Sequence, residues 1–356
     1  MKITGIHTTP VLAPLPVPLR TASGSIERFP LVLIELSTDA GVTGRAYAQS
    51  YLPELLPALD RTVAGMGAMT VGQALAPRDL HELLRRRLRL LGVKGLAGMA
   101  LGALDLVFWD AWARSRGECL ARSLGAEPRP LRAYNSVGLY DADSVAPLAE
   151  ETMAAGFAGL KIKLGFPTLA EDLAAVRAAR RVLGDQLALM VDYNQSLSAP
   201  EALLRCRALD DEGLAWIEEP VLADDFEACA RIAAAVHTPI QIGENFHGPG
   251  DMRAAIAAQA MDLVMPDPQF VHGVTGWMEA AALARGAGLP MSSHIFVEAS
   301  AQLLCATPTA HWIEVLDAAG GLRREPLDVR GGCLHPSQAP GLGIEWDEHA
   351  VRRMRA

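Results

Sequence analysis

From residue 131 onward, short apolar segments alternate with segments of helical spacing, and this alternation is the strongest constraint on the fold. The intervening segments, such as 169–183 and 201–212, are rich in Ala, Leu and Arg, as expected for helices of about 12–15 residues. Units in which a strand precedes a helix build a parallel sheet, so eight such units predict an α/β fold, a (β/α)8 TIM barrel. The last helix is the least clear, so we expect a modified barrel. The predicted strands are residues 131–136, 159–164, 187–192, 214–218, 239–244, 261–267, 290–294 and 311–314.

The residues before the barrel indicate an α+β domain. Segments 2–13 and 31–48 alternate or run apolar, as in a small antiparallel sheet, with a turn at 39–41 before a third strand. Between the first two strands, residues 14–30 are rich in Pro, Ser and Gly, and we expect a functional loop there. Helical patterns follow at about 53–66, 78–91 and 95–116.

The chain therefore divides into three predicted parts. The α+β domain covers residues 1–125, and the barrel covers residues 126–317. Residues 318–356, rich in Gly and Pro, are expected to fold back over the first domain. A chain of 356 residues, half of them apolar, is long enough for two domains of this kind.

Composition and charge exclude several classes of partner. The net charge is -9 and the only basic block is 85–87, so we expect no nucleic-acid partner. The five cysteines are scattered, which indicates neither a disulfide framework nor a zinc site. The most apolar long segment, 95–109, is interrupted by Asp105, and the N-terminus lacks the pattern of a signal peptide. We therefore expect a soluble, cytoplasmic protein with no membrane partner.

Seven of the predicted strands carry a charged residue at or near the carboxyl end. In a barrel of this type, the active site lies at the carboxyl ends of the strands. A single acid at such a position is more often the N-cap of a helix. Seven charged groups at the same mouth of the barrel are better explained by an active site than by helix capping. These seven residues are Lys163, Asp192, Glu218, Glu244, Asp267, His294 and Glu314.

The carboxylates of Asp192, Glu218 and Glu244 end three successive predicted strands. Three converging carboxylates repel one another unless a cation lies between them. Because all the ligand atoms are oxygens, a hard divalent ion is favoured over zinc. We expect Mg2+, with Mn2+ as the alternative.

Two lysines and a histidine supply the candidate bases. Lys161 and Lys163 point to the same face of a strand, although a lone pattern of this kind is more often an exposed edge strand. Burial beside another ammonium group and a divalent cation should lower the pKa of Lys163 toward that of a general base. Lys161 would then bind a substrate carboxylate. His294 could approach from the opposite side of the barrel, with Asp267 fixing its second ring nitrogen.

Glu314 ends the eighth predicted strand and could be a protonated acid that donates to a developing oxyanion. Together with the metal, the two bases and Lys161, this set is suited to removing a proton α to a carboxylate. The ene-diolate that results is stabilised by the surrounding positive charges, which dominate such reactions. The residues therefore predict an enzyme that acts on a small carboxylic acid.

The chain resembles the enolase superfamily, and within it the mandelate racemase subgroup, also known as the mandelate racemase/muconate lactonizing enzyme family. The resemblance covers most of the chain and implies a barrel mouth capped by the N-terminal domain. It also implies the metal, base and carboxylate-binding roles given above. The segments of this chain that carry the resemblance are 18–21, 30–34, Leu160–Gly165, Val191–Ser196, Trp216–Pro220, Gly243–Asn245, Met265–Asp267, 273–277, Pro290–His294 and 306–312.

The same resemblance implies the residues that bind the substrate. Ser136 and Asn194 match polar residues near the substrate carboxylate and hydroxyl. Leu19, Ile26 and Tyr51 match positions of the cap that face the substrate side chain. A mostly apolar cap favours an aromatic or aliphatic side chain over a polyhydroxylated one. The family also implies a homo-oligomer, often an octamer.

Two departures from the family pattern follow Asp267. The family usually has a lysine or arginine three residues further on and then a Gly-Gly pair, whereas this chain has Phe270 and His272-Gly273. Loss of a cation near Asp267 and His294 could shift the pKa of His294 or change the shape of the pocket.

Three functions remain open at this stage. The favoured one is racemisation of a 2-hydroxy acid, and the alternative is dehydration of an acid sugar by the same residues. A scaffold that keeps the fold without catalysis is disfavoured because both Lys163 and His294 are present.

Overall fold

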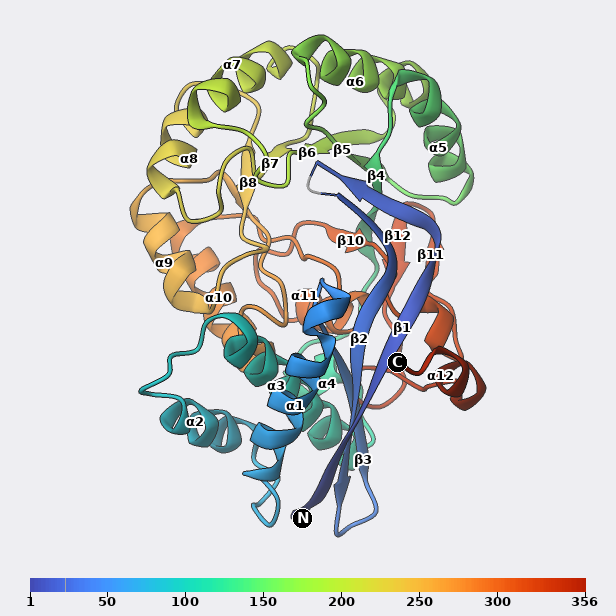
Figure 1. Cartoon of the computed structure of the whole chain (residues 1–356), viewed down its shortest axis with the longest axis vertical. Coiled ribbons are helices and arrows are strands. Elements are labelled where there is room, and N and C mark those ends of the chain that lie inside the picture. The colour runs from blue at the N-terminus through green and yellow to red at the C-terminus, as the bar shows by residue number, and fades with distance from the viewer. Residues whose placement is uncertain (23) are drawn as a thin grey trace.

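The computed structural model describes residues 1–22 and 24–356 and contains two sheets (Figure 1). The N-terminal sheet has the antiparallel order β1-β2-β3, formed by Ile3–Thr21, Gly24–Thr38 and Thr43–Gln49. Helices follow the sheet in the chain, and α1 and α3 among them pack against it. Their bounds are η1 Pro53–Leu55, α1 Leu56–Ala68, α2 Pro77–Arg87, α3 Gly95–Ser115 and α4 Leu120–Ser123.

The prediction of a loop at residues 14–30 is wrong, because β1 and β2 continue through this segment as a long antiparallel ribbon. The pairing shifts register between Pro14 and Leu19 and then resumes with Leu19 opposite Ile26. Proline interrupts a central strand because it lacks an N–H donor, but β1 lies at the sheet edge, where that donor is not needed. The ribbon reaches the carboxyl ends of the barrel strands (Figure 1). The barrel mouth is thus covered by a β-ribbon.

The second sheet confirms the predicted parallel barrel and its modified form. Strands β4 to β9 pair in parallel order, and β10 closes the ring by pairing with β4. Short strands β11 (Asp328–Arg330) and β12 (Cys333–His335) extend the sheet next to β4 in antiparallel direction. The barrel strands are β4 Leu131–Leu139, β5 Gly159–Lys163, β6 Ala188–Asp192, β7 Ile217–Glu218, β8 Ile240–Ile242, β9 Leu263–Val264 and β10 Ile313–Val315.

The predicted strand at 290–294 is reduced to an isolated bridge. Met291 bridges Val264 on one side and Ala310 on the other, which keeps the segment in the seventh strand position. The N–H of Ser292 donates to Val264 and that of Ser293 to Trp312, so the backbone bonds alternate between both neighbours. A full ladder does not form, yet the segment still delivers His294 to the barrel mouth.

Helices surround the barrel (Figure 1). They alternate with the strands as the sequence predicts. Helix α11 (Val297–Cys305) follows the seventh strand position, whereas the eighth strand, β10, is followed by the short 3-10 helix η2 (Gly320–Leu322) in the place of the last helix, which the sequence left least clear. Their bounds are α5 Ala142–Ala154, α6 Leu169–Leu183, α7 Ala199–Leu209, α8 Phe226–Ala233, α9 Pro249–Ala257, α10 Gly273–Ala287 and α11 Val297–Cys305, followed by η2 Gly320–Leu322 and α12 Glu348–Met354.

The C-terminal residues contact the N-terminal domain. The N–H of Ala356 donates to the carbonyl of Pro10, and Arg355 bridges Val11. Glu345 accepts hydrogen bonds from Arg45 at 2.8 Å and from Arg114 at 2.7 Å. These contacts hold residues 345–356 against β1, β3 and α3. The boundaries predicted between the three parts of the chain stay predictions.

Helix α3 is long and apolar enough to cross a membrane by composition, but 89% of its apolar window is buried inside the protein. It packs between β3 of the cap and α10 of the barrel. Asp105, the charge that interrupts it, accepts hydrogen bonds from the backbone N–H and the hydroxyl of Thr275, both at 2.8 Å. The helix is therefore the joint between the two domains.

We expect Gly102→Ala to destabilise this joint. A Cβ at Gly102 would lie 2.0 Å from the backbone carbonyl oxygen of Gln269, which cannot move aside as a flexible side chain can. Overpacking of this kind costs about 1–3 kcal/mol. Gly65→Ala in α1 is the matched control, because no atom lies within 4 Å of its Cβ position, and it should stabilise by about 0.5–1 kcal/mol. Urea unfolding measures both, and a Gly102→Ala variant as stable as the wild type would contradict the close packing.

Candidate active site

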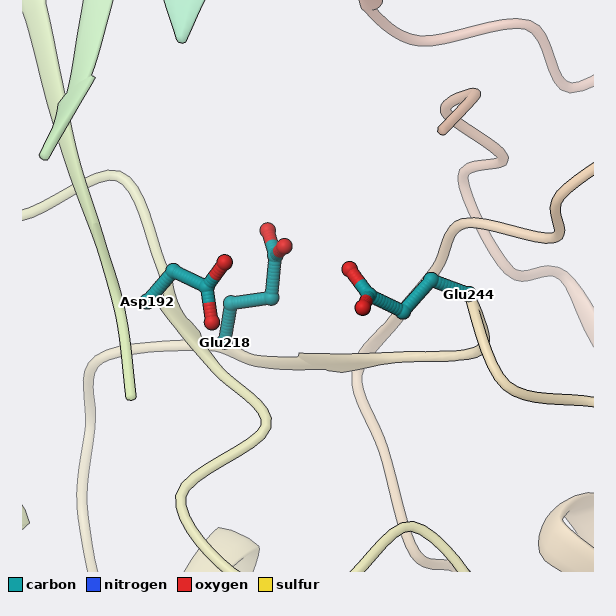
Figure 2. Close-up of side chains that lie close together, drawn as sticks. All are labelled: Asp192, Glu218 and Glu244. Carbon is teal, nitrogen blue, oxygen red and sulfur yellow. The ribbon is translucent and has the colours of Figure 1, made fainter. Parts of the chain in front are cut away.

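Three buried carboxylates meet at the carboxyl ends of β6, β7 and β8 (Figure 2). Asp192 and Glu218 are the last residues of neighbouring strands and pair in register, and Glu244 follows the end of β8. Each offers an oxygen within 4.8 Å of the others. The sequence predicted this convergence.

The carboxylate cluster fits a divalent cation. Glu244 Oε2 is buried and accepts no hydrogen bond from the residues that the structure describes, although His294 Nε2 lies 3.3 Å away. Burial, together with the charges of Asp192 and Glu244, raises the pKa of Glu218 to about 8 against the opposing effect of Lys161. Such a crowded set of oxygen ligands is the donor set that Mg2+ prefers.

The two lysines of β5 pair with these carboxylates from within the barrel. Lys161 Nζ lies 2.5 Å from Glu218 Oε1 and 2.8 Å from Glu314 Oε1. Lys163 Nζ lies 2.5 Å from Asp192 Oδ2. Both lysines are buried, so the exposed edge strand that a lone pattern would suggest is excluded.

The prediction of a lowered pKa for Lys163 presupposes a divalent cation beside it, and it stays a prediction. Burial lowers the pKa, as expected, but the charge of Asp192 raises it, and the net value lies above the ordinary range of lysine. The reason is that the metal-binding carboxylate and the candidate base are direct partners. A cation that shares Asp192 opposes this effect, because it competes for the same negative charge.

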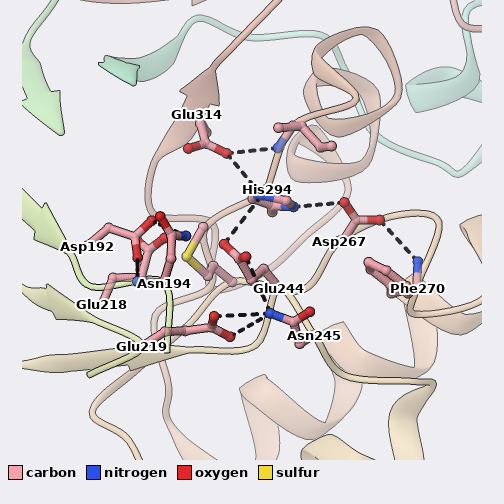
Figure 3. Close-up of polar contacts among 12 residues, drawn as sticks. Asp192, Asn194, Glu218, Glu219, Glu244, Asn245, Asp267, Phe270, His294 and Glu314 are labelled. Carbon is pink, nitrogen blue, oxygen red and sulfur yellow. Dashed lines mark hydrogen bonds and ion pairs between the residues drawn. The ribbon is translucent and has the colours of Figure 1, made fainter. Parts of the chain in front are cut away.

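His294 and Asp267 form the predicted pair (Figure 3). His294 Nδ1 lies 2.8 Å from Asp267 Oδ2. The other Asp267 oxygen accepts from the backbone N–H groups of Gln269 and Phe270 at 2.7 and 3.0 Å. Burial lowers the pKa of His294, but Glu244, Asp267 and Glu314 raise it to about 10 overall. The Nε2 atom of this histidine therefore faces the carboxylate cluster.

Phe270, which replaces the family's basic residue, packs against the cap. The ring of Phe270 stacks on the ring of Tyr51, with centroids 5.8 Å apart. Its hydrogen bond to Asp267 is donated by the backbone N–H, so the bond does not depend on the side chain at this position. His272 has a left-handed backbone with φ of 73° and its Nε2 lies 2.9 Å from the Val93 carbonyl. The departures thus place an aromatic ring against Tyr51 of the cap and leave the contact between His294 and Asp267 intact.

The prediction of a protonated Glu314 is wrong. Burial raises the pKa of this carboxyl group, but the charges of Lys161 and His294 lower it below the ordinary value overall. Its second oxygen accepts from the backbone N–H of Ile295 at 2.9 Å. Glu314 is therefore an ionised acceptor that positions Lys161.

A cavity of about 270 Å³ lies between the ribbon and the barrel mouth. Leu19, Ile26 and Tyr51 line it from the cap, and Asn194 lines it from the barrel, as the resemblance implies. The charged residues around it are Lys163, Glu244 and His294. The structure thus brings both candidate bases and a metal-binding carboxylate to one cavity.

Ser136 lies on β4, next to the strand of Lys161, and does not belong to the lining of the cavity. It pairs with Lys161 in register, and its buried hydroxyl has no hydrogen-bond partner among the described residues. Asn194 has a left-handed backbone with φ of 44°, which lets its N–H and side-chain amide donate to Asp192 at 2.7 and 3.1 Å. Asn194 therefore also orients a metal ligand.

Several site residues were not predicted. Asn245 donates to both oxygens of Glu219 at 3.0 Å and to Glu244 at 3.3 Å, and Glu219 is buried, with a pKa raised mainly by burial. In the sequence, Glu219 directly follows Glu218 and Asn245 directly follows Glu244, and this position next to a predicted metal ligand could have marked both as site residues. Gln49 also lines the cavity, and no pattern in the sequence marks it.

Comparison with known proteins defines the class. Residues 3–125 match the model of the mandelate racemase / muconate lactonizing enzyme N-terminal domain, and residues 144–350 match the enolase C-terminal domain-like model. The fold and site are therefore those of an enolase-superfamily protein. The chain belongs to the mandelate racemase / muconate lactonizing enzyme family, which confirms the resemblance.

Similar proteins carry out several reactions. An enolase from Bradyrhizobium, solved with magnesium and mandelic acid, has 43% identity and a TM-score of 0.96 over 100% of this chain and 98% of its own. The L-talarate/galactarate dehydratase of Salmonella typhimurium is 33% identical over 78% of this chain and 71% of its own. The D-galactarolactone cycloisomerase of Agrobacterium fabrum is 29% identical over 100% of this chain and 99% of its own.

Proposed function

We propose that this protein binds Mg2+ through Asp192, Glu218 and Glu244 and racemises a 2-hydroxy acid that has an apolar side chain. The observation that carries the proposal is the shared cavity, whose wall includes Lys163, His294 and Glu244 beneath a mostly apolar cap. The magnesium and mandelic acid bound by the Bradyrhizobium relative give independent support.

The bound metal ion would supply positive charge that stabilises the substrate carboxylate as it becomes an ene-diolate. Lys161, held by Glu218 and Glu314, is placed to bind the same carboxylate. Lys163 takes the α-proton from one face, and its burial favours the neutral amine once Asp192 is engaged by a cation. His294 returns a proton to the other face through Nε2, because Asp267 holds Nδ1.

Dehydration of an acid sugar is the second candidate, because the Salmonella relative is a dehydratase. The same groups would act, with one of them donating a proton to the departing 3-hydroxyl group. The cap side of the cavity is formed largely by apolar side chains, among them Leu19, Ile26 and Phe29. This wall favours racemisation, since a polyhydroxylated chain would leave many hydroxyl groups unpaired against it.

A substrate panel in D2O with Mg2+ tests the two candidates. The panel contains both enantiomers of aromatic and aliphatic 2-hydroxy acids and several acid sugars, followed by NMR and polarimetry. We expect deuterium at the α-carbon together with loss of optical rotation for the aromatic acids. A 2-keto-3-deoxy product from an acid sugar, without racemisation of any 2-hydroxy acid, would overturn the proposal in favour of dehydration.

A further inference from the structure

The side chain of Gln49 is a buried amide without a partner on the wall of the cavity. Gln49 is the last residue of β3, is 0% exposed and lines the cavity. Neither its Oε1 nor its Nε2 has a hydrogen-bond partner among the described residues. Burying an amide with no compensating hydrogen bond is costly, so such a group on a cavity wall points to a ligand.

The backbone of Gln49 is held firmly although its side chain is not. Its N–H donates to Gln269 Oε1 at 2.8 Å, and Gln269 Nε2 donates back to its carbonyl at 3.0 Å. The N–H of Gln269 in turn donates to Asp267, the partner of His294. The backbone of Gln49 is therefore positioned relative to the candidate base, and its unpartnered amide offers one donor group and one acceptor from that anchored position.

The surroundings of Gln49 restrict what it can bind. The cap residues that share the cavity wall, including Leu19, Ile26 and Phe29, are apolar or uncharged. Every charged residue that lines the cavity belongs to the catalytic end, namely Lys163, Glu244 and His294. Among the residues that the structure describes, a second carboxylate on the substrate would find no cation on the cap side of the cavity wall. A neutral hydroxyl group, in contrast, can both donate to and accept from an amide.

We infer that Gln49 determines specificity by hydrogen bonding a hydroxyl group on the side chain of the substrate. The inference rests on the proposed function and adds one polar group to the otherwise apolar side chain of its substrate. The substrate class becomes 2-hydroxy monocarboxylic acids whose aromatic side chain carries a hydroxyl group, with the ring against the apolar wall and its hydroxyl group at Gln49. Diacids with a carboxylate at each end are disfavoured.

Binding of hydroxamates, which imitate the ene-diolate without reacting, tests the inference. Calorimetry with Mg2+ compares benzohydroxamate with its 3-hydroxy and 4-hydroxy derivatives. We expect at least one hydroxylated compound to bind the wild type about 10-fold more tightly. In Gln49→Met this preference should fall below about threefold, because the amide is lost while side-chain length is kept. The preference compares two ligands in one protein sample, so partial misfolding does not imitate the result.

Gln195→Met is the matched control. Gln195 lines the same cavity, but its Oε1 already accepts from the N–H of Ala223 at 2.9 Å, so the preference should remain. Equal binding of all three compounds by the wild type, a preference that persists in Gln49→Met, or no binding of any of them would overturn the inference. Deuterium exchange with hydroxymandelates reports separately on the proposed function, because it can fail while the Gln49-dependent preference in hydroxamate binding persists.

Discussion

Replacement of Lys163 by Ala or of His294 by Asn is expected to reduce racemisation by about 10²–10⁴-fold or more. Racemisation needs proton removal on one face and proton return on the other, so loss of either group stops the full reaction. Both residues line the cavity, and each lies within 3.3 Å of a metal-binding carboxylate. Polarimetry with Mg2+ and an aromatic 2-hydroxy acid measures the effect.

Matched controls exist elsewhere on the chain. The side chains of Lys94 and His237 are 70% and 101% exposed, and neither lines the cavity. Lys94→Ala and His237→Asn should therefore retain the wild-type rate. A Lys163→Ala or His294→Asn variant that racemises within tenfold of these controls would show that its residue is not a base.

Removal of the metal ligand Glu218 is expected to abolish the effect of Mg2+ on stability as well as on activity. A ligand that binds only the folded protein stabilises it by about 2.7 kcal/mol at a concentration of 100 times its Kd. We expect Mg2+ to raise the melting temperature of the EDTA-treated wild type and to restore its activity. In Glu218→Gln, Mg2+ affinity should fall by at least about 100-fold. The reason is that loss of a residue that only hydrogen-bonds to a metal ligand already lowers metal affinity or activity by about 10–100-fold.

The control for this prediction is Glu227→Gln, which makes the same change at an exposed position of α8. This variant should respond to Mg2+ as the wild type does. Restoration of activity by Zn2+ but not by Mg2+ would contradict the assignment of a hard-ion site, and so would an unchanged Mg2+ affinity in Glu218→Gln.

The barrel and its metal-binding carboxylates could be predicted because they depend on local patterns. Seven of the eight apolar segments predicted as barrel strands end at or near a charged residue, and the carboxyl ends of parallel strands meet at one mouth. The three carboxylates of β6, β7 and β8 follow from this rule alone. The segment 290–294 still reached the mouth although its ladder is incomplete, because the backbone bonds of Ser292 and Ser293 alternate between two neighbours.

Features that depend on tertiary context could not be predicted. Pro14 and Pro18 indicated a loop, whereas the edge position of β1, unknown from sequence, allows them in a strand. The ionised state of Glu314 follows from its contact with Lys161, and the raised pKa of Lys163 from its contact with Asp192. The role inferred for Gln49 depends on its unpartnered amide beside the cavity, a tertiary feature that no pattern in the sequence marks.

Exchange of the α-proton by the two single variants tests the central claim most directly. Each variant is incubated in D2O with Mg2+ and with each enantiomer of an aromatic 2-hydroxy acid, and NMR follows deuterium at the α-carbon. The account predicts that Lys163→Ala exchanges one enantiomer and His294→Asn exchanges the other, since each retains a base on only one face. Exchange of both enantiomers by either variant, or of the same enantiomer by both, would contradict the assignment of two bases on opposite faces.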